Sequence, residues 1–273
     1  MSVRLIHVST LNKEGWNDLN AEATKQARLI LHKCGGLPKV VVALAESLAS
    51  RPAASVDWRW LGDNFMHKLE THNDFASLQG FFAWVRSYFH TCPDFLKPCI
   101  FYLSIFPVNH GIRQGRLVRR WIAEGYARDT KESTAEEASV DFISKLGKLS
   151  IIQKKVFLFH VNGFFREYIR SRSMEDNLVF ALEGCCSANS QRGGRHLTVG
   201  TSWDRDTNVL DCMDLSRLRS LTVFGEWRPF VISKKMRLLR VLDLEDTCSG
   251  VTDGDVEQMV QLLPRLKFLS LRG

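Results

Sequence analysis

The chain lacks the features of a membrane protein, a secreted protein or a zinc protein. Its longest apolar run, Cys99 to Phe106, is far shorter than the roughly 20 residues of a membrane-spanning helix. No long apolar segment follows Met1, so no secretory signal is predicted. The seven cysteines form no Cys-x-x-Cys pair, and no His/Cys group has zinc-finger spacing. We therefore expect a soluble, intracellular protein with free thiols, no membrane span and no metal site.

The chain also lacks a recognisable catalytic or phosphate-binding motif. No segment has the form Gly-x-x-x-x-Gly-Lys-Ser/Thr, whose backbone amides and lysine hold nucleotide phosphates. The Gly147-Lys148 pair is followed by Leu149, and Phe142 stands where the first glycine should be. No convincing Ser/His/Asp or Cys/His nucleophile arrangement is found. The sequence therefore predicts that the protein is not an enzyme.

The composition that is present indicates an ordinary globular chain with a moderate excess of positive charge. Its 273 residues leave room for two or three small domains, and the 45% hydrophobic content can form real cores. The net charge is +7, with a pI of about 9.1. This charge admits an anionic partner without demanding one.

The stretch from Phe95 to Asp129 predicts two helices joined by a short turn. The first is apolar and ends at Pro107. In the second, apolar residues recur on one face and arginines on the opposite face. Ser133 and Thr134 precede Glu136 and Glu137, and these two overlapping capping boxes predict a further helix to about Lys148, with Val140, Ile143 and Leu146 on its buried face. Residues 151–159 suit the strands of a wing, so the segment resembles a helix-turn-helix or winged-helix unit. The apolar residues of the second helix are Leu117, Val118, Trp121 and Ile122, and its arginines are Arg113, Arg116, Arg119 and Arg120.

Upstream of this unit the sequence predicts a short strand and four helices. The strand is expected over residues 3–8, and the helices over 22–34, from Pro38 onward, over 58–70 and over 74–90. Pro38 lies in the first turn of its helix, where a missing N–H costs nothing. The aromatic residues of 74–90 are expected to fill a core rather than to stack on bases.

The C-terminal part predicts leucine-rich repeats. Three copies of the pattern L-x-x-L-x-x-L-x-L begin at residues 215, 236 and 263, with conservative changes, and Leu197 and Val199 suggest an earlier, degenerate copy. Each copy predicts one short strand whose leucines point into the core. The chain ends within the last copy, so we expect its final repeats to be its least stable part. The predicted repeat core consists of Leu218, Leu221, Val223, Leu239, Leu242, Leu244, Leu266, Leu269 and Leu271.

The amino-acid sequences of two segments resemble those of the plant nucleotide-binding, leucine-rich-repeat immune receptors. These segments are Leu96 to Pro107 and Arg119 to Gly125, and they match the winged-helix part of the family. CysGlyGlyLeuProLysVal resembles the family's Gly-Leu-Pro-Leu-Ala motif, with Lys39 replacing the apolar residue after the proline. The resemblance implies that Pro38 packs near a bound adenine. It also places Val161, Asn162 and Gly163 at the family's Met-His-Asp motif, whose histidine touches the β-phosphate of ADP. Both polar residues of that motif have changed in this chain. Asn162 can still cap the next helix and donate one hydrogen bond to a phosphate.

The resemblance covers roughly residues 20–272 and implies a mainly α fold, a helical bundle plus a winged helix, followed by the α/β start of a repeat solenoid. Its expected divisions are a remnant of the nucleotide-binding module (1–72), a winged-helix domain (73–172), a linker (173–195) and incomplete repeats (196–273). It implies a receptor in defence against pathogens, switched by ADP and ATP, with protein partners on the repeats. Because the family's phosphate loop lies upstream of everything seen here, we expect a fragment that does not bind nucleotide by itself.

A second interpretation is a winged-helix DNA-binding protein. It relies on the face formed by Arg113, Arg116, Arg119 and Arg120 and on the basic pI. Against it, repeats of this type have no evident role on DNA, and charged faces are usually only solvated. No specific nucleic-acid partner is therefore expected.

Overall fold

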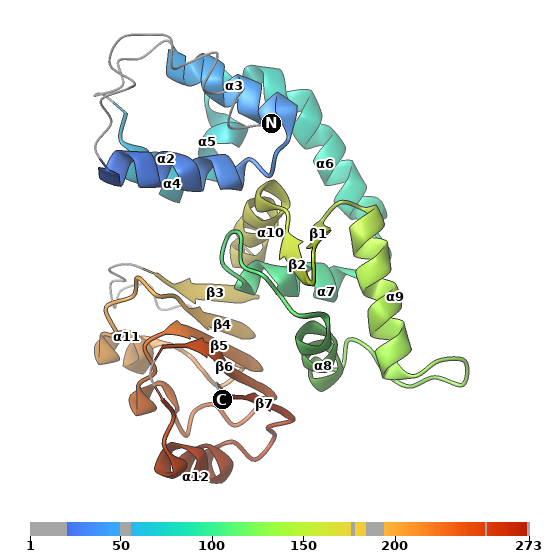
Figure 1. The fold of residues 1–273 in the computed structure, drawn as a ribbon, viewed down its shortest axis with the longest axis vertical. Helices are drawn as coiled ribbons and strands as arrows, with labels where there is room; N and C mark the ends of the chain where they lie inside the picture. The colour runs from blue at the N-terminus through green and yellow to red at the C-terminus, as the bar shows by residue number, and fades with distance from the viewer. Residues whose placement is uncertain (1–20, 50–55, 176–177, 184–193, 249, 272–273) are drawn as a thin grey trace. The chain divides into compact units, whose positions relative to one another are not determined.

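The computed structural model describes residues 21–49, 56–175, 178–183, 194–248 and 250–271. The strand expected over residues 3–8 lies outside this part. The described chain is a mixed α/β protein with a five-stranded parallel sheet (Figure 1). It divides into two compact units, which are described separately. The first unit consists of Met1–Asp94, Val108–His110 and Val161–Ser171, and the second of Phe95–Pro107, Gly111–His160 and Arg172–Gly273.

The described part of the first unit is helical. It contains α2 (Ala21–Lys33), α3 (Pro38–Ala49), α4 (Trp58–Asp63), α5 (Phe65–Thr71), the 3-10 helix η2 (Asn73–Leu78), α6 (Gln79–Thr91) and the beginning of α10 (Gly163–Glu175). The helices that begin near residue 21 and at Pro38 are confirmed. The single helices expected over 58–70 and 74–90 are each divided in two. Asn64 ends α4 with a ψ of 18°, and Phe75 departs from helical geometry within η2.

Aromatic residues of α6 pack against the first turns of α10. The rings of Phe81 and Phe82 lie 5.2 and 5.8 Å from that of Phe164, and the ring of Phe89 lies 5.2 Å from that of Tyr168. Such pairs add to the stability gained from burying the rings. The prediction that these aromatics form a core therefore holds for Phe82, which is buried, whereas Trp84 on the same helix is 53% exposed.

The winged-helix part of the second unit contains α7 (Lys97–Tyr102), η3 (Leu103–Ile105), α8 (Gln114–Glu124), α9 (Ala135–Lys148), β1 (Ile152–Lys155) and most of β2 (Leu158–Val161). The Thr134 capping box is present, and α9 ends at Lys148 as predicted. Ile143 and Leu146 are buried, but Val140 is 43% exposed, so its place in the buried face was predicted wrongly. The strands β1 and β2 form a two-stranded sheet, the wing, and Ile112 makes an isolated antiparallel bridge with Phe159 of β2.

The rest of the second unit is built on a parallel sheet in the order β3 (Val179–Leu182), β4 (His196–Val199), β5 (Ser220–Gly225), β6 (Val241–Thr247) and β7 (Phe268–Ser270). Leu197, Leu221, Leu242 and Leu269 occupy matching positions on adjacent strands. The connections hold α11 (Thr207–Cys212), η4 (Pro229–Val231) and α12 (Asp253–Leu262). Because side chains alternate along a strand, the leucines line one face of the sheet and polar residues the other.

The predicted repeat positions lie mainly in the core behind this sheet. Leu218, Leu221, Val223, Leu239, Leu242 and Leu244 are buried, Leu266 and Leu269 are partly buried against the same core, and Leu271 is 38% exposed after β7. Strand β3 lies within the stretch 173–195, whose Gly, Ser and Asn content resembles a linker. Its residues Val179, Phe180 and Leu182 are nevertheless buried, because they extend the sheet beyond β4.

Candidate functional site

Helix α8 is buried on both of its faces, although only one of them is apolar. Its backbone ends at Gly125, whose φ of 81° suits glycine at a helix C-cap. Leu117 and Trp121 are fully buried on the apolar face, as predicted. Arg116 and Arg120, on the opposite face, are also buried, with only 3% and 0% exposure. Buried arginines require partners, and the polar face of the parallel sheet supplies them.

The sheet presents a row of buried polar residues toward α8. Thr222 on β5 and Asp243 on β6 are direct neighbours in the strand register, and neither is exposed. Ala123 of α8 packs with Val241 and Phe268 beside them. The polar residues of this face are His196, Thr198, Ser220, Thr222 and Asp243.

Arg116 makes a two-pronged contact with Asp243. Its Nε donates to Oδ2 at 2.8 Å, and its Nη2 donates to Oδ1 at 2.9 Å. Nη2 also lies 2.7 Å from Oδ2 of Asp246. A fork of this kind matches the planar guanidinium to a carboxylate and is among the stronger hydrogen-bond geometries in proteins.

Arg120 connects three parts of the second unit. Its Nε donates to the Tyr102 hydroxyl at 2.7 Å, its Nη1 donates to Asp243, and its Nη2 donates to the Thr222 hydroxyl. The guanidinium carbon lies 5.1 Å from the ring centres of both Tyr102 and Phe106. Hydrogen bonds and cation–π contacts together replace the water that this cation loses on burial.

The electrostatics of the contact favour an ionised Asp243. Burial alone would raise the pKa of its carboxyl, but the charge of Arg120 and the hydrogen bonds from Arg116 outweigh burial and hold the pKa below its usual value. One carboxylate thus serves two buried cations at once. We call Arg116, Arg120 and Asp243 the ionic lock.

The C-terminal end of α8 is held by two further arginines from the sheet. The backbone carbonyl of Glu124 accepts a hydrogen bond from Arg219 Nη2 at 2.7 Å and another from Arg240 Nη1 at 3.0 Å. The last carbonyls of a helix are unsatisfied and carry partial negative charge, so cations there are favourable. Because Arg219 and Arg240 precede β5 and β6, consecutive strands contribute matching contacts.

The side chain of Glu124 is less well satisfied. It is 1% exposed, and Arg219 Nε lies 3.2 Å from Oε2, yet neither carboxylate oxygen accepts a well-directed hydrogen bond from the described residues. Burial raises the pKa of Glu124 to about 7, against the attraction of four arginines. Burial and three of these arginines, Arg219, Arg120 and Arg195, lower the pKa of His196 to about 3. This histidine is therefore neutral, and Tyr126 and Ser220 each lie 2.9 Å from one of its ring nitrogens.

The structure overturns the interpretation of the four arginines as a single exposed basic face. Arg116 and Arg120 are buried in the ionic lock, and the exposed Arg113 is paired with Glu245, so among the described residues Arg119 is the one of the four that is exposed without an ion pair. In helix-turn-helix proteins the second helix of the pair enters the major groove. In the pair predicted from the sequence that helix is α8, whose Arg116 and Arg120 are buried; α9, which follows it, exposes Glu136, Glu137 and Asp141. These carboxylates disfavour the phosphate backbone of DNA.

The residues predicted at the nucleotide come from one corner of the first unit. Pro38 begins α3 and is exposed. Asn162 is 6% exposed and precedes α10. Its Nδ2 donates to the Gly35 carbonyl at 2.9 Å, and its Oδ1 accepts from the backbone N–H groups of Phe164 and Phe165 at 3.1 and 3.4 Å. Asn162 therefore caps α10, as predicted, and joins it to the turn between α2 and α3.

This corner has no room for the side chains of the family motif. Gly35 has a φ of 60°, and a Cβ there would lie 2.1 Å from Asn162 Oδ1. A Cβ on Gly163 would lie 1.8 Å from the His32 carbonyl oxygen. Val161 is buried beside them. Since the Asn162 amide is already bonded at both ends, it does not fit the role of a phosphate ligand, whereas the packing of Pro38 near an adenine stays a prediction.

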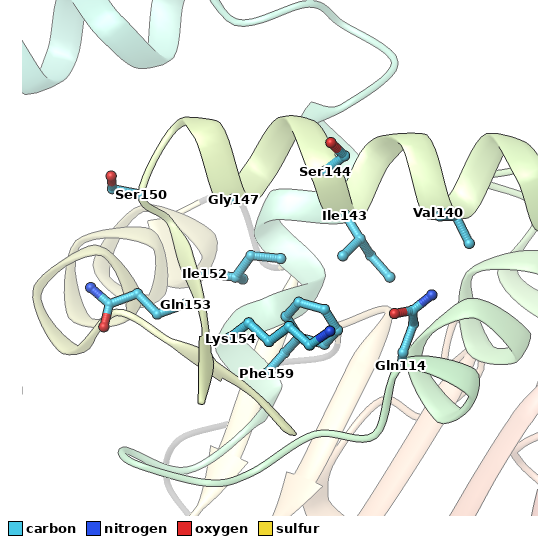
Figure 2. A pocket seen from close by; sticks show the side chains of 10 residues that line it. All are labelled: Gln114, Val140, Ile143, Ser144, Gly147, Ser150, Ile152, Gln153, Lys154 and Phe159. Atoms are coloured by element: carbon cyan, nitrogen blue, oxygen red, sulfur yellow. The ribbon is translucent and has the colours of Figure 1, made fainter. Parts of the chain in front are cut away.

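The winged-helix part also contains an open cavity of about 510 Å³. Figure 2 shows it between α9 above, the β1–β2 hairpin and Gln114 at the start of α8. Ile143, Ile152 and Phe159 supply apolar lining, and Lys154 supplies a charge. Within the described part of the chain no group of three His, Cys, Asp or Glu residues could hold a metal ion, and no helix is long and apolar enough to cross a bilayer.

Sequence reasoning identified α8 but missed its partners. Asp243, Tyr102 and Glu124 are the functional residues of this contact that were not singled out. One signal was available, because Asp243 lies between Leu242 and Leu244 and so must occupy the polar face of a predicted strand. An acid at that position, with two arginines on one helix face, could have suggested a pair.

These features define a class: a winged helix whose second helix is fixed, through buried charges, to the polar face of a parallel repeat sheet. The family described as "Disease resistance protein Winged helix domain" matches residues 105–175. Over 251 residues the chain is 34% identical to the disease resistance protein PIK6-NP of Oryza sativa subsp. japonica, a match that covers 88% of this chain and 23% of the relative. Identity to Pik-2 of the same organism is 32% over 250 residues, covering 88% of this chain and 24% of the relative.

A relative from another plant shows the same similarity at lower identity. The putative disease resistance RPP13-like protein 2 of Arabidopsis thaliana is 26% identical over 287 residues, which covers 95% of this chain and 32% of the relative. The chain spans about a quarter of the length of the first relatives it matches. It is a region, containing the winged-helix domain, of a plant disease resistance protein of the nucleotide-binding, leucine-rich-repeat family.

Proposed function

We propose that this chain acts in innate immunity as the part of a disease resistance receptor that ties the winged helix to the first leucine-rich repeats. The single observation that carries the proposal is the ionic lock, in which Asp243 of β6 is buried against Arg116 and Arg120 of α8. Removing one partner of such a contact costs much free energy, because the other partner is left as an uncompensated buried charge. The contact therefore favours two discrete arrangements, closed or fully separated, over a gradual loosening.

In this proposal the divisions of the chain have separate roles. Residues 1–72 belong to the end of the nucleotide-binding module, and residues 73–172 form the winged helix. Residues 173–195 link the winged helix to residues 196–273, which begin the repeat solenoid. The receptor works inside the cell and not as an enzyme, and the repeats contact a protein partner. ADP or ATP, implied by the family, would be bound chiefly by residues outside this chain, since Asn162 is engaged with Gly35 and α10.

The test is a pair of substitutions in the plant gene that encodes this chain. Loss of the gene should raise susceptibility to at least one pathogen strain in infection assays. Asp243→Asn at the native locus should instead trigger cell death without infection, because the lock no longer holds the closed arrangement. Glu226→Gln removes a charge from an exposed ion pair with Arg228 and serves as the matched control. Normal resistance in the null plant together with a silent Asp243→Asn allele would refute the proposal.

A further inference from the structure

The tip of the β1–β2 hairpin exposes apolar side chains that the fold does not use. Val156 is 80% exposed and Phe157 is 86% exposed, the highest values among the large apolar residues that the structure describes. Leu158, which follows them, is 36% exposed. Single exposed apolar residues are common, but a consecutive group at one exposed turn suggests a contact surface.

The backbone at the tip of this hairpin is in a strained conformation. Val156 has a φ of 56°, a left-handed conformation that β-branched residues strongly disfavour. Glycine or asparagine is the ordinary choice at such a turn position. Strain of this kind persists where a side chain is needed for something other than the turn itself.

The surroundings of the tip carry charge of one sign. Residues 142–161 contain four lysines and no aspartate or glutamate. Lys145 is paired with Asp141, but Lys148, Lys154 and Lys155 are exposed and have no ion pair within the described residues. Since Lys154 and Lys155 are consecutive in a strand, they project to opposite faces of the hairpin and place a cation on each side of the apolar tip.

We propose that this tip docks on an anionic lipid surface. The apolar side chains would enter the boundary between headgroups and acyl chains, while the lysines meet anionic headgroups in the plane above. A bilayer requires no shape complementarity, so two or three exposed apolar side chains flanked by lysines are enough to bind it. The phosphates of a nucleic acid would satisfy the lysines but would leave Val156 and Phe157 in water. The inference goes beyond the proposed receptor role, because it assigns a peripheral membrane contact to the wing itself.

Co-sedimentation of the full chain with vesicles tests the proposal. Vesicles of 70% phosphatidylcholine and 30% phosphatidylserine should bind the chain reversibly, with binding weakened by salt, and pure phosphatidylcholine vesicles should bind it far less. Lys154→Ala with Lys155→Ala should lower the partition coefficient on the order of 25-fold, about fivefold per lysine. Phe157→Ser should lower it roughly tenfold or more.

Matched controls separate the tip from general surface effects. Val260→Ser removes another well-exposed apolar side chain, and Lys234→Ala with Lys267→Ala removes two exposed lysines elsewhere; both should leave binding unchanged. Val156→Gly relieves the turn, so it should raise thermal stability while weakening vesicle binding. If Val156 had only a structural role, thermal stability and vesicle binding would rise or fall together.

Three outcomes would overturn the proposal. The first is equal binding to neutral and anionic vesicles, and the second is equal loss in the control variants. The third is an absence of vesicle binding combined with binding to a DNA duplex that the Lys154 and Lys155 substitutions abolish. In that case the hairpin would be a nucleic-acid contact.

Discussion

Removing the charge of Asp243 tests the ionic lock most directly. The carboxylate is fully buried and accepts hydrogen bonds from both Arg116 and Arg120. Breaking a buried ion pair on one side typically costs about 3–5 kcal/mol, because an uncompensated charge remains. Arg116 keeps Asp246 as a partner, whereas the hydrogen-bond partners left to Arg120 among the described residues are the neutral Tyr102 and Thr222. We therefore expect Asp243→Asn to cost about 3 kcal/mol, the lower end of the range.

Hydrogen exchange read by mass spectrometry is the suitable assay, because a chain of two compact units need not unfold in one step. Peptides from α8, β5 and β6 should lose protection in Asp243→Asn, while peptides from α2 and α3 should not change. A double-mutant cycle with Arg120→Met should show a coupling of at least 1 kcal/mol, since the second change removes the charge that the first left unpaired. A cost below 1 kcal/mol, or two changes that simply add, would refute the reasoning.

Three further predictions concern other parts of the chain. Because the pKa of Glu124 is raised to about 7 from an ordinary 4.5, the folded state binds the extra proton, so this group should lower stability by about 3 kcal/mol as pH rises from 4.5 to 7; Glu124→Gln should flatten that slope in thermal melts across this range, and an unchanged slope would contradict the assignment. Gly163→Ala should destabilise the first unit by about 1–3 kcal/mol because of the clash with the His32 carbonyl, whereas Gly80→Ala, which meets nothing within 4 Å, should not; equal melting temperatures for the two variants would count against the clash. Calorimetry with Mg-ATP should detect no tight binding by the chain alone, and micromolar binding that Asn162→Ala abolishes would show that the corner does hold a phosphate.

The sequence predicted local features well where one segment contains the whole signal. The Thr134 capping box, the proline at the start of α3 and the leucine periodicity of the strands each depend on residues within one turn or one repeat. It predicted poorly where two distant segments decide the outcome. Arg116 and Arg120 look like a solvated face until Asp243, more than 120 residues later, is placed against them. The prediction for Val140 was wrong in the opposite sense: this apolar residue was expected to be buried, but it is exposed.

The ionic lock also constrains how the repeats of such a protein can be exchanged or diversified. Any recombination point between residues 120 and 243 would separate the two arginines from the aspartate that neutralises them. A chimera with an uncharged residue at position 243 would leave the buried Arg120 without its aspartate, however well its leucines match. Arg219 and Arg240 add the same requirement at the end of α8. We therefore expect the strands that carry Arg219, Arg240 and Asp243 to be inherited together with the winged helix, because each part neutralises or satisfies charged groups of the other.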